Sequence, residues 1–252
     1  MALIEHSAVQ VGPTGIVGDR RYALIDPHDR LVNGKRIGPL ATIVAGVKDG
    51  PEALALHFPD GSVVEELVVP GKALLATFYG ERRAVREVQG SFSGVLSEWA
   101  GQPLRLVRLD DEGGGIDRTP EGGGFSIVSS GSLLALAQAA RLDEPLDPRR
   151  FRMSAVVDGI EPYGEEAWLG RRVQLGEVVV EVGGNIGRCA VTSHDPATGR
   201  RSLDTLRLLA ETRGHVAATE PLPFGVWASV LVPGWIRLGD TVTGLDGGPG
   251  SP

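Results

Sequence analysis

Turn-forming residues interrupt this chain so frequently that long helices have little room to form. Of its 252 residues, 36 are glycine and 17 are proline, and only 5% are aromatic. Short apolar segments separated by Asn-Gly, Asp-Gly and Pro-Gly pairs are typical of strands joined by tight turns. The sequence therefore predicts a mainly β, barrel-like fold with a few helices.

Composition and charge narrow the class of protein further. A hydrophobic content of 42% and a charged content of 23% are ordinary for a soluble globular protein. The net charge of −7 argues against an extended nucleic-acid surface, so we expect no nucleic-acid partner. No apolar run reaches the roughly 18 residues that span a bilayer, so we expect no membrane partner. The first residues also lack the basic and apolar regions of a secretion signal.

Local patterns predict where the elements lie. Apolar or alternating segments predict strands over residues 21–25, 41–47, 54–58, 63–69, 105–109, 125–128, 151–157, 173–175, 178–182, 227–232 and 235–242. Apolar residues at helical spacing predict helices over 92–100, 133–141 and 205–212, the second with Ser132 as its N-cap. The remaining patterns indicate a turn over 12–18, a flexible glycine-rich loop over 110–124 and a disordered tail over 244–252. The loop divides the chain into a small antiparallel unit, 1–109, and a second unit, 125–243.

One short stretch carries the clearest chemistry. Cys189 is the only cysteine, and it follows a strand pattern that two breakers, Gly183 and Gly184, end. The neighbouring Arg188 favours the thiolate, because a cation and backbone amide dipoles stabilise the charged form. A lone cysteine is also commonly a small buried hydrophobe, and these residues leave both interpretations open. One cysteine excludes an intramolecular disulfide, which predicts a reducing, cytoplasmic location.

Other polar clusters give weaker signals. The Ser129-Ser130-Gly131-Ser132 turn lies between a strand and a helix, where backbone N–H groups can hold an anion, although these residues alone favour ordinary helix capping. His194 lies close enough in sequence to Cys189 to suggest a Cys–His nucleophile, but the spacing does not define a dyad. Glu165 and Glu166 are interpreted as a solvated face rather than an acid–base pair. Five scattered histidines have no metal-binding spacing.

The cysteine stretch also resembles a family signature. Residues 188–199 resemble Arg-Cys-x-x-Thr-Thr/Ser-x-Asp-Pro-x-Thr-Gly, the motif of the MOSC superfamily, the molybdenum cofactor sulfurase C-terminal domain. Further segments resemble family elements in the same order. They are residues 150–159 (Arg-Phe-Arg-Pro-Asn strand), 165–176 (Glu-Asp-x-Trp-x-Gly segment), 206–210 and 224–240 (closing elements), and 18–26 (N-terminal β-barrel domain).

The resemblance implies a MOSC β-barrel domain, a smaller N-terminal β-barrel-like domain and a molybdenum cofactor, which is a pterin dithiolene with a terminal phosphate. By similarity to the amidoxime-reducing branch, Cys189 would ligate molybdenum and Arg188 would help hold the thiolate and the anionic cofactor. Arg152 would contact the pterin or its phosphate. The other cofactor-binding positions that the resemblance implies are Ser154, Lys35, Arg36, Ser129, Ser130 and Thr192.

The implied activity is reduction of N-hydroxylated small molecules. A separate ferredoxin- or flavin-type partner would supply the electrons, since one cysteine cannot hold an iron–sulfur cluster. The chain departs from the family pattern in two places: the opening Lys-Ser strand is missing, and Ser154 replaces an asparagine. Two alternatives therefore stay open, a sulfur carrier with a persulfide on Cys189 and a binding module that lacks the cofactor. Superfamily descriptions also mention pyridoxal phosphate.

Overall fold

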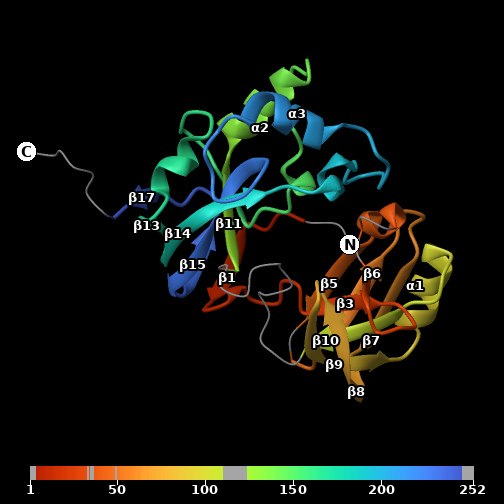
Figure 1. The fold of residues 1–252 in the computed structure, drawn as a ribbon. Helices are drawn as coiled ribbons and strands as arrows, with labels where there is room; N and C mark the ends of the chain where they lie inside the picture. The colour runs from red at the N-terminus through yellow and green to blue at the C-terminus, as the bar shows by residue number, and fades with distance from the viewer. Residues whose placement is uncertain (1–3, 33, 35–36, 49, 110–123, 246–252) are drawn as a thin grey trace, which may run out of the picture.

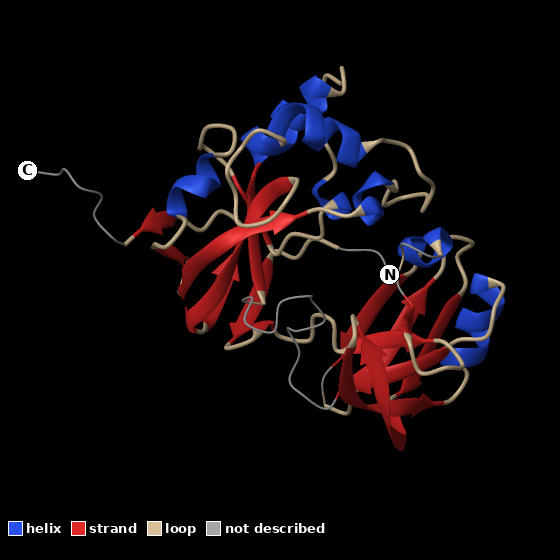
Figure 2. Ribbon diagram, viewed as in Figure 1, coloured by secondary structure: helices blue, strands red, loops and turns tan. Residues whose placement is uncertain are grey.

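The computed structural model describes residues 4–32, 34, 37–48, 50–109 and 124–245, which form two β-rich units side by side (Figure 1). Strands dominate both units and helices are few (Figure 2). The predicted mainly β fold with some α is therefore confirmed. Nearly all of the predicted loop and tail lies outside the described residues, at 110–123 and 246–252. The domain boundaries at residues 109 and 125 stay predictions.

Two antiparallel sheets and one helix build the N-terminal unit. The larger sheet has the order β4-β3-β10-β9-β8 and the smaller one β5-β6-β7. Their strands are β3 (Tyr22–Ile25), β4 (Leu31–Val32), β5 (Val44–Lys48), β6 (Ala53–His57), β7 (Val63–Leu67), β8 (Val69–Phe78), β9 (Glu81–Gln89) and β10 (Arg105–Leu109). The sequence patterns missed the β8–β9 hairpin. Its turn places Tyr79 at φ 51° and Gly80 at φ 100°, a conformation that glycine tolerates better than tyrosine.

The main core of this unit lies where both sheets pack together with helix α1 (Phe92–Ala100). Phe92, Leu96 and Leu56 are fully buried there. The helix ends at Gly101, whose left-handed φ of 67° lets its N–H reach the Glu98 carbonyl. The predicted strand over 41–47 begins later, because Gly38–Thr42 forms the 3₁₀ helix η1.

A curled six-stranded sheet forms the C-terminal unit, in the order β12-β11-β15-β14-β13-β17. β11 and β12 are parallel, and the other neighbours are antiparallel. The strands are β11 (Phe125–Ser129), β12 (Ala155–Val157), β13 (Arg172–Leu175), β14 (Val178–Gly187), β15 (Pro223–Val232) and β17 (Val242–Gly244). Helices α2 (Ser130–Ala139) and α3 (Thr205–Arg213) cover one side of this sheet (Figure 1). Three short 3₁₀ helices complete the unit: η2 (Pro148–Arg150), η3 (Gly164–Trp168) and η4 (Ala190–Ser193).

The first described strand belongs to this C-terminal unit by its pairing. β1 (Ala8–Gly12) pairs with β16 (Gly234–Arg237) and with β2 (Gly15–Ile16), forming a small sheet. Val11 is almost fully buried in the same core as the strands of the six-stranded sheet. Residues 12–18, predicted as a turn, therefore contain the end of one strand and the whole of another.

Strand β14 continues through the two glycines predicted to break it and ends at Gly187. Register shifts on both sides of Gly184 and Asn185 bend the strand against β15. A Cβ on Gly183 would lie 2.0 Å from the Trp227 ring, so the glycine makes room for that side chain. The strand, with its buried valines, leads directly into residues 188–199, called the cysteine loop below.

Two further predictions are corrected. The strand predicted over 151–157 starts only at Ala155, because η2 and a left-handed Arg152 (φ 52°) precede it. The strand predicted over 235–242 is two strands, separated by a turn with Gly239 at φ 87°. Within the described residues, no helix has the length and apolar character needed to cross a bilayer.

Candidate functional site

Cys189 is separated from the end of β14 by Arg188 and is the N-cap residue of η4. Its thiol is free and the residue is half-buried. The Cys189 carbonyl accepts hydrogen bonds from the Thr192 N–H (3.1 Å) and the Thr192 hydroxyl (3.0 Å). These two bonds close the turn that fixes the direction of the cysteine backbone. Thr192 itself is 2% exposed, so it acts here by holding the turn.

Arg188 connects the cysteine to two neighbouring segments. Its guanidinium donates to the Phe224 carbonyl (2.8 Å from Nε), to the Phe151 carbonyl (3.0 Å) and to the Met153 sulfur (2.8 Å). It also lies 5.5 Å from the centroid of the Phe151 ring, within cation–π range. The described contacts of Arg188 therefore go to protein atoms of the 151–153 segment and of β15.

The turn after η4 is closed by Asp195. Its carboxylate accepts from the Ala197 N–H, the Thr198 N–H and the Thr198 hydroxyl, at 3.0, 2.9 and 3.1 Å. Partial burial by itself would raise the pKa of Asp195. The hydrogen bonds from Thr198 and Ala197, together with the Arg150 charge, outweigh that effect and hold the pKa below its usual value.

His194 lies in the same loop, and its Nδ1 is 3.3 Å from the Val191 carbonyl oxygen. In the described part of the chain, no hydrogen bond joins this ring to the Cys189 thiol. Ser193 is 1% exposed, and its hydroxyl has no hydrogen-bond partner among the described residues. A buried hydroxyl without a partner is costly and commonly marks a place where a water or ligand completes the bonding.

Two predicted cofactor residues lie on the segment that Arg188 contacts. Arg152 is exposed, and its left-handed backbone turns the chain between Phe151 and Met153. Ser154 exchanges hydrogen bonds with Ser126 on β11: its hydroxyl accepts from the Ser126 N–H at 3.1 Å, and its N–H donates to the Ser126 hydroxyl at 2.9 Å. Ser154 thus attaches this segment to the sheet.

The predicted anion-binding turn has a different cap from the one expected. Ser129, not Ser132, is the N-cap of α2, and its hydroxyl accepts from the Ser132 N–H at 3.0 Å. The prediction of Ser132 as the N-cap was wrong because the helix already begins at Ser130, two residues earlier. Ser130 is half-buried. The Ser132 hydroxyl instead donates to the Glu165 carboxylate at 2.9 Å. An internal carboxylate therefore already lies beside this helix N-terminus, where negative charge is stabilised.

The interpretation of Glu165 and Glu166 as a solvated face was also wrong. Glu165 is 0% exposed, and Glu166 forms an ion pair with Arg213 and accepts from the Asn185 amide at 3.1 Å. Arg213 lies over the Tyr163 ring, 4.0 Å from its centroid. Adjacent glutamates alone gave no sign of this, because the basic and amide partners come from distant elements.

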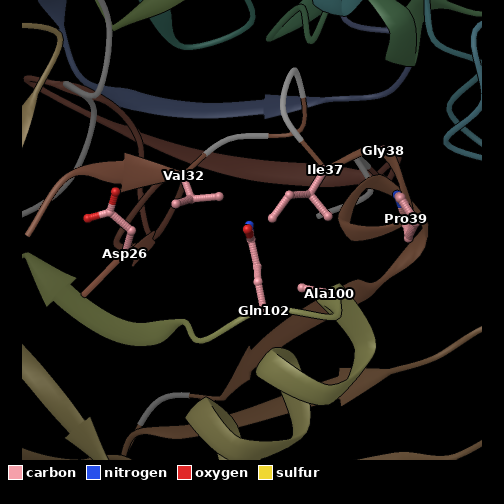
Figure 3. A pocket seen from close by; sticks show the side chains of 7 residues that line it. All are labelled: Asp26, Val32, Ile37, Gly38, Pro39, Ala100 and Gln102. Atoms are coloured by element: carbon pink, nitrogen blue, oxygen red, sulfur yellow. The ribbon is translucent and has the colours of Figure 1, made fainter. Parts of the chain in front are cut away.

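The N-terminal unit reaches the cysteine loop through η1. A Cβ on Gly38 would lie 2.1 Å from the Gly199 carbonyl oxygen and 3.8 Å from the His194 ring. Lys35 and Arg36, predicted to bind the cofactor, lie outside the described residues. The segment that follows them borders a cavity of about 390 Å³ lined by Asp26, Val32, Ile37, Gly38, Pro39, Ala100 and Gln102. Figure 3 shows Gln102 directed toward Val32 and Ile37, with Asp26 on one side and Pro39 on the other.

Comparison with known proteins identifies the C-terminal unit. Residues 122–243 match the family model described as the MOSC domain. This part of the chain is a MOSC domain. Its cysteine loop, its 151–153 segment and the buried polar groups around Glu165 all lie within the matched residues.

Curated relatives of this chain include two kinds of protein. Mitochondrial amidoxime-reducing component 1 of Xenopus laevis is 25% identical over 91% of this chain, which covers 73% of that protein. Molybdenum cofactor sulfurase of Danio rerio is 26% identical over 81% of this chain, which covers 28% of the sulfurase. The chain thus spans under a third of the sulfurase. Among solved structures, YiiM from Geobacillus stearothermophilus is 17% identical, covers 49% of this chain and 54% of its own, and has a TM-score of 0.37.

The residue of this MOSC domain that sequence reasoning missed is Arg150. Its side chain is 9% exposed, and it donates to the His194 carbonyl at 2.8 Å and to the Ser202 hydroxyl at 2.7 Å. The motif match drew attention to Arg152, two residues later. Two acceptors of Arg150 are backbone carbonyls. Every residue has a backbone carbonyl, so the sequence does not indicate which ones Arg150 contacts.

Proposed function

We propose that this chain is a molybdenum-cofactor enzyme that reduces N-hydroxylated small molecules, with Cys189 as the protein ligand of the metal. One observation carries the proposal. Cys189 presents a free, half-buried thiol at the end of β14, while the polar groups next to it hold the turn that positions it. A soft thiolate on a fixed backbone suits a molybdenum ligand.

The residues around the thiol fit an anionic cofactor. The Ser193 hydroxyl is buried and has no hydrogen-bond partner in the described part of the chain, and an additional acceptor or donor would complete its bonding. Arg152 supplies an exposed guanidinium on the segment that Arg188 holds, and guanidinium groups match phosphate geometry. Ser154, Ser129, Ser130, Thr192, Arg188, Lys35 and Arg36 are the further cofactor-binding positions of this proposal. Among the described residues, no group of three His, Cys, Asp or Glu side chains is arranged to hold a metal, so the cofactor would supply most of the ligands.

Bound molybdenum would supply the electron exchange that removes oxygen from an N–O bond. The chain would contribute the thiolate, the fixed turn and the basic groups that hold and orient the cofactor. Electrons would come from a separate ferredoxin- or flavin-type donor. The similarity to amidoxime-reducing component 1 supports this choice of reaction, and we propose a cytoplasmic location.

Metal analysis tests the proposal directly. Protein from a host that makes the cofactor is analysed for molybdenum, together with Cys189→Ser and with Ser229→Ala as a half-buried control on β15. We expect about one molybdenum per chain in the wild type and the control, and none in Cys189→Ser. Retention of the metal by Cys189→Ser would exclude the thiolate as its ligand. Absence of molybdenum from all three would contradict the proposed enzyme.

A second candidate function rests on the same free thiol. A half-buried, unpaired cysteine can carry a persulfide, and molybdenum cofactor sulfurase is among the relatives. In that function a sulfane sulfur would move from Cys189 to an acceptor thiol, leaving the Cys189 thiol behind. Intact-protein mass spectrometry would then show one added sulfur, absent from Cys189→Ser and removed by dithiothreitol. A protein with neither molybdenum nor persulfide would be the binding module considered above.

A further inference from the structure

In the MOSC domain, residues 150–153 and residues 188–194 are joined by hydrogen bonds from one arginine on each segment. Arg188, next to the cysteine, donates to the Phe151 carbonyl and the Met153 sulfur. Arg150, at the other end of that segment, donates back to the His194 carbonyl in the loop after the cysteine. Each segment therefore supplies one guanidinium to the other.

The contacts of Arg150 lead to the cysteine itself. Its Nη1 lies 3.5 Å from the Thr192 carbonyl and 2.8 Å from the His194 carbonyl. Its Nη2 lies 2.7 Å from the Ser202 hydroxyl and 3.5 Å from the Asp195 carboxylate. Thr192 in turn bonds the Cys189 carbonyl through both its N–H and its hydroxyl. One residue thus separates Arg150 from Cys189 along this chain of hydrogen bonds.

The burial of Arg150 distinguishes it from its neighbour. The Arg150 side chain is 9% exposed, and this burial lowers its pKa although Asp195 and Asp147 oppose the shift. Arg149 lies on the same 3₁₀ helix, but its side chain is 39% exposed and, among the described residues, donates hydrogen bonds to Asp147. Hydrogen bonds from a buried cation are worth more than those from an exposed one. Arg149 is therefore a suitable control for Arg150, because it lies next to Arg150 in the chain but its described hydrogen bonds do not reach the loop.

We propose that Arg150 is a positioning residue for Cys189. It holds the loop from η4 to Gly199 in the conformation that fixes the orientation of the Cys189 thiol. The contacts from Arg188 to Phe151 and Met153 keep residues 151–153 beside that loop. The inference rests on the proposed function in taking Cys189 as the reactive group. Its test uses the protein without added molybdenum, so the two proposals can fail separately.

The experiment measures how fast iodoacetamide alkylates Cys189 across the pH range in which a thiol ionises. The single cysteine makes the signal unambiguous. The variants are Arg150→Met, Arg150→Lys and the control Arg149→Met. Because charged hydrogen bonds restrain the loop, we expect Cys189 of the Arg150→Met variant to be alkylated about tenfold faster than in the wild type. Arg150→Lys retains the charge and should recover part of the effect, while Arg149→Met should stay within about twofold of wild type.

The opposite result is equally clear. If Arg150→Met melts at a lower temperature but keeps the wild-type alkylation rate, Arg150 only stabilises the fold and the proposal is wrong. Should that variant fail to fold, Ser202→Ala removes one acceptor and leaves the buried charge in place. It should alkylate about twofold to threefold faster, and an unchanged rate would overturn the proposal. Normal molybdenum content with unchanged alkylation would reject the positioning role alone.

Discussion

The backbone of Gly38 lies directly against the backbone of Gly199. A Cβ on Gly38 would be 2.1 Å from the Gly199 carbonyl oxygen, and a Cβ on Gly199 would be 2.3 Å from the Gly38 carbonyl oxygen. Neither contact involves a flexible side chain that could move aside. The N-terminal unit and the cysteine loop therefore meet where only two glycines allow the chains to approach.

This contact predicts that Gly38→Ala destabilises the protein by about 1–3 kcal/mol, because the added methyl group must separate two backbones. Gly46→Ala on β5 is the control, since nothing lies within 4 Å of its Cβ. We expect the control to change the free energy of unfolding by less than about 0.5 kcal/mol. Urea unfolding of both variants measures the difference. Equal stability of the two would show that the glycine contact does not constrain the units.

The buried Ser132–Glu165 contact gives a second prediction. The Ser132 hydroxyl donates to Glu165 at 2.9 Å and accepts from the Tyr163 N–H at 2.7 Å. Ser132→Ala leaves both groups short of a partner, which should cost about 1–3 kcal/mol of unfolding free energy. Ser130→Ala, in the first turn of the same helix, should cost less than about 0.5 kcal/mol. Alanine favours helices more than serine does, so helix propensity cannot cause a loss, and a loss of similar size in both variants would contradict the role of the buried contact.

Arg188 gives a third prediction, through the geometry of its acceptors. One guanidinium reaches two carbonyls and a sulfur, and a lysine ammonium cannot match that planar arrangement. Arg188→Lys should therefore lower the free energy of unfolding by about 2–4 kcal/mol. The control is Arg172→Lys, whose side chain is 58% exposed and lies 3.9 Å from Glu181. That exposed pair should contribute less than about 0.5 kcal/mol. Thermal melting of both variants would reveal the contrast, and similar melting temperatures would contradict it.

Asp195 predicts an acid-dependent loss of stability. Hydrogen bonds from Thr198 and Ala197 depress its pKa in the folded protein, against the effect of partial burial. A depressed folded pKa means that these bonds stabilise the protein fully above the unfolded pKa of about 4, and that this stability is lost as pH falls through the folded pKa. Asp195→Asn should thus be less stable than wild type at neutral pH, and the gap should narrow under acid. Unfolding curves at several pH values test this, and a gap that stays constant would exclude Asp195 as its source.

The sequence predicted best those elements whose signals are local. Helical spacing and a following glycine gave α1 its bounds, and an apolar segment gave those of β10. The start of β12 could not be predicted, because Arg152 has a left-handed conformation between Phe151 and Met153. Arg188 donates hydrogen bonds to the carbonyl of the first and the sulfur of the second. The burial of Glu165 was equally hidden, since its partner Ser132 lies on another element.

In the candidate site, too, residues with a local sequence signal were predicted and residues that act through distant contacts were not. The motif predicted Cys189 and its arginine, because a thiol beside a cation is visible in the sequence. It did not predict Arg150 as a contact of the loop, because the Thr192 and His194 carbonyls that it binds are backbone atoms present at every position. The resemblance nevertheless included Arg150 in its matched segment.

The pairing of β1 with β16 has a consequence for how the protein is made. Val9 is registered against Ile236, so β1 stays without this partner until β16, more than 200 residues later in the chain, has been synthesised. Everything needed for the N-terminal sheets is synthesised in between. We therefore expect that unit to fold during translation while β1 remains without β16, and the core of the C-terminal unit to close only once β16 has been synthesised and these two distant segments meet.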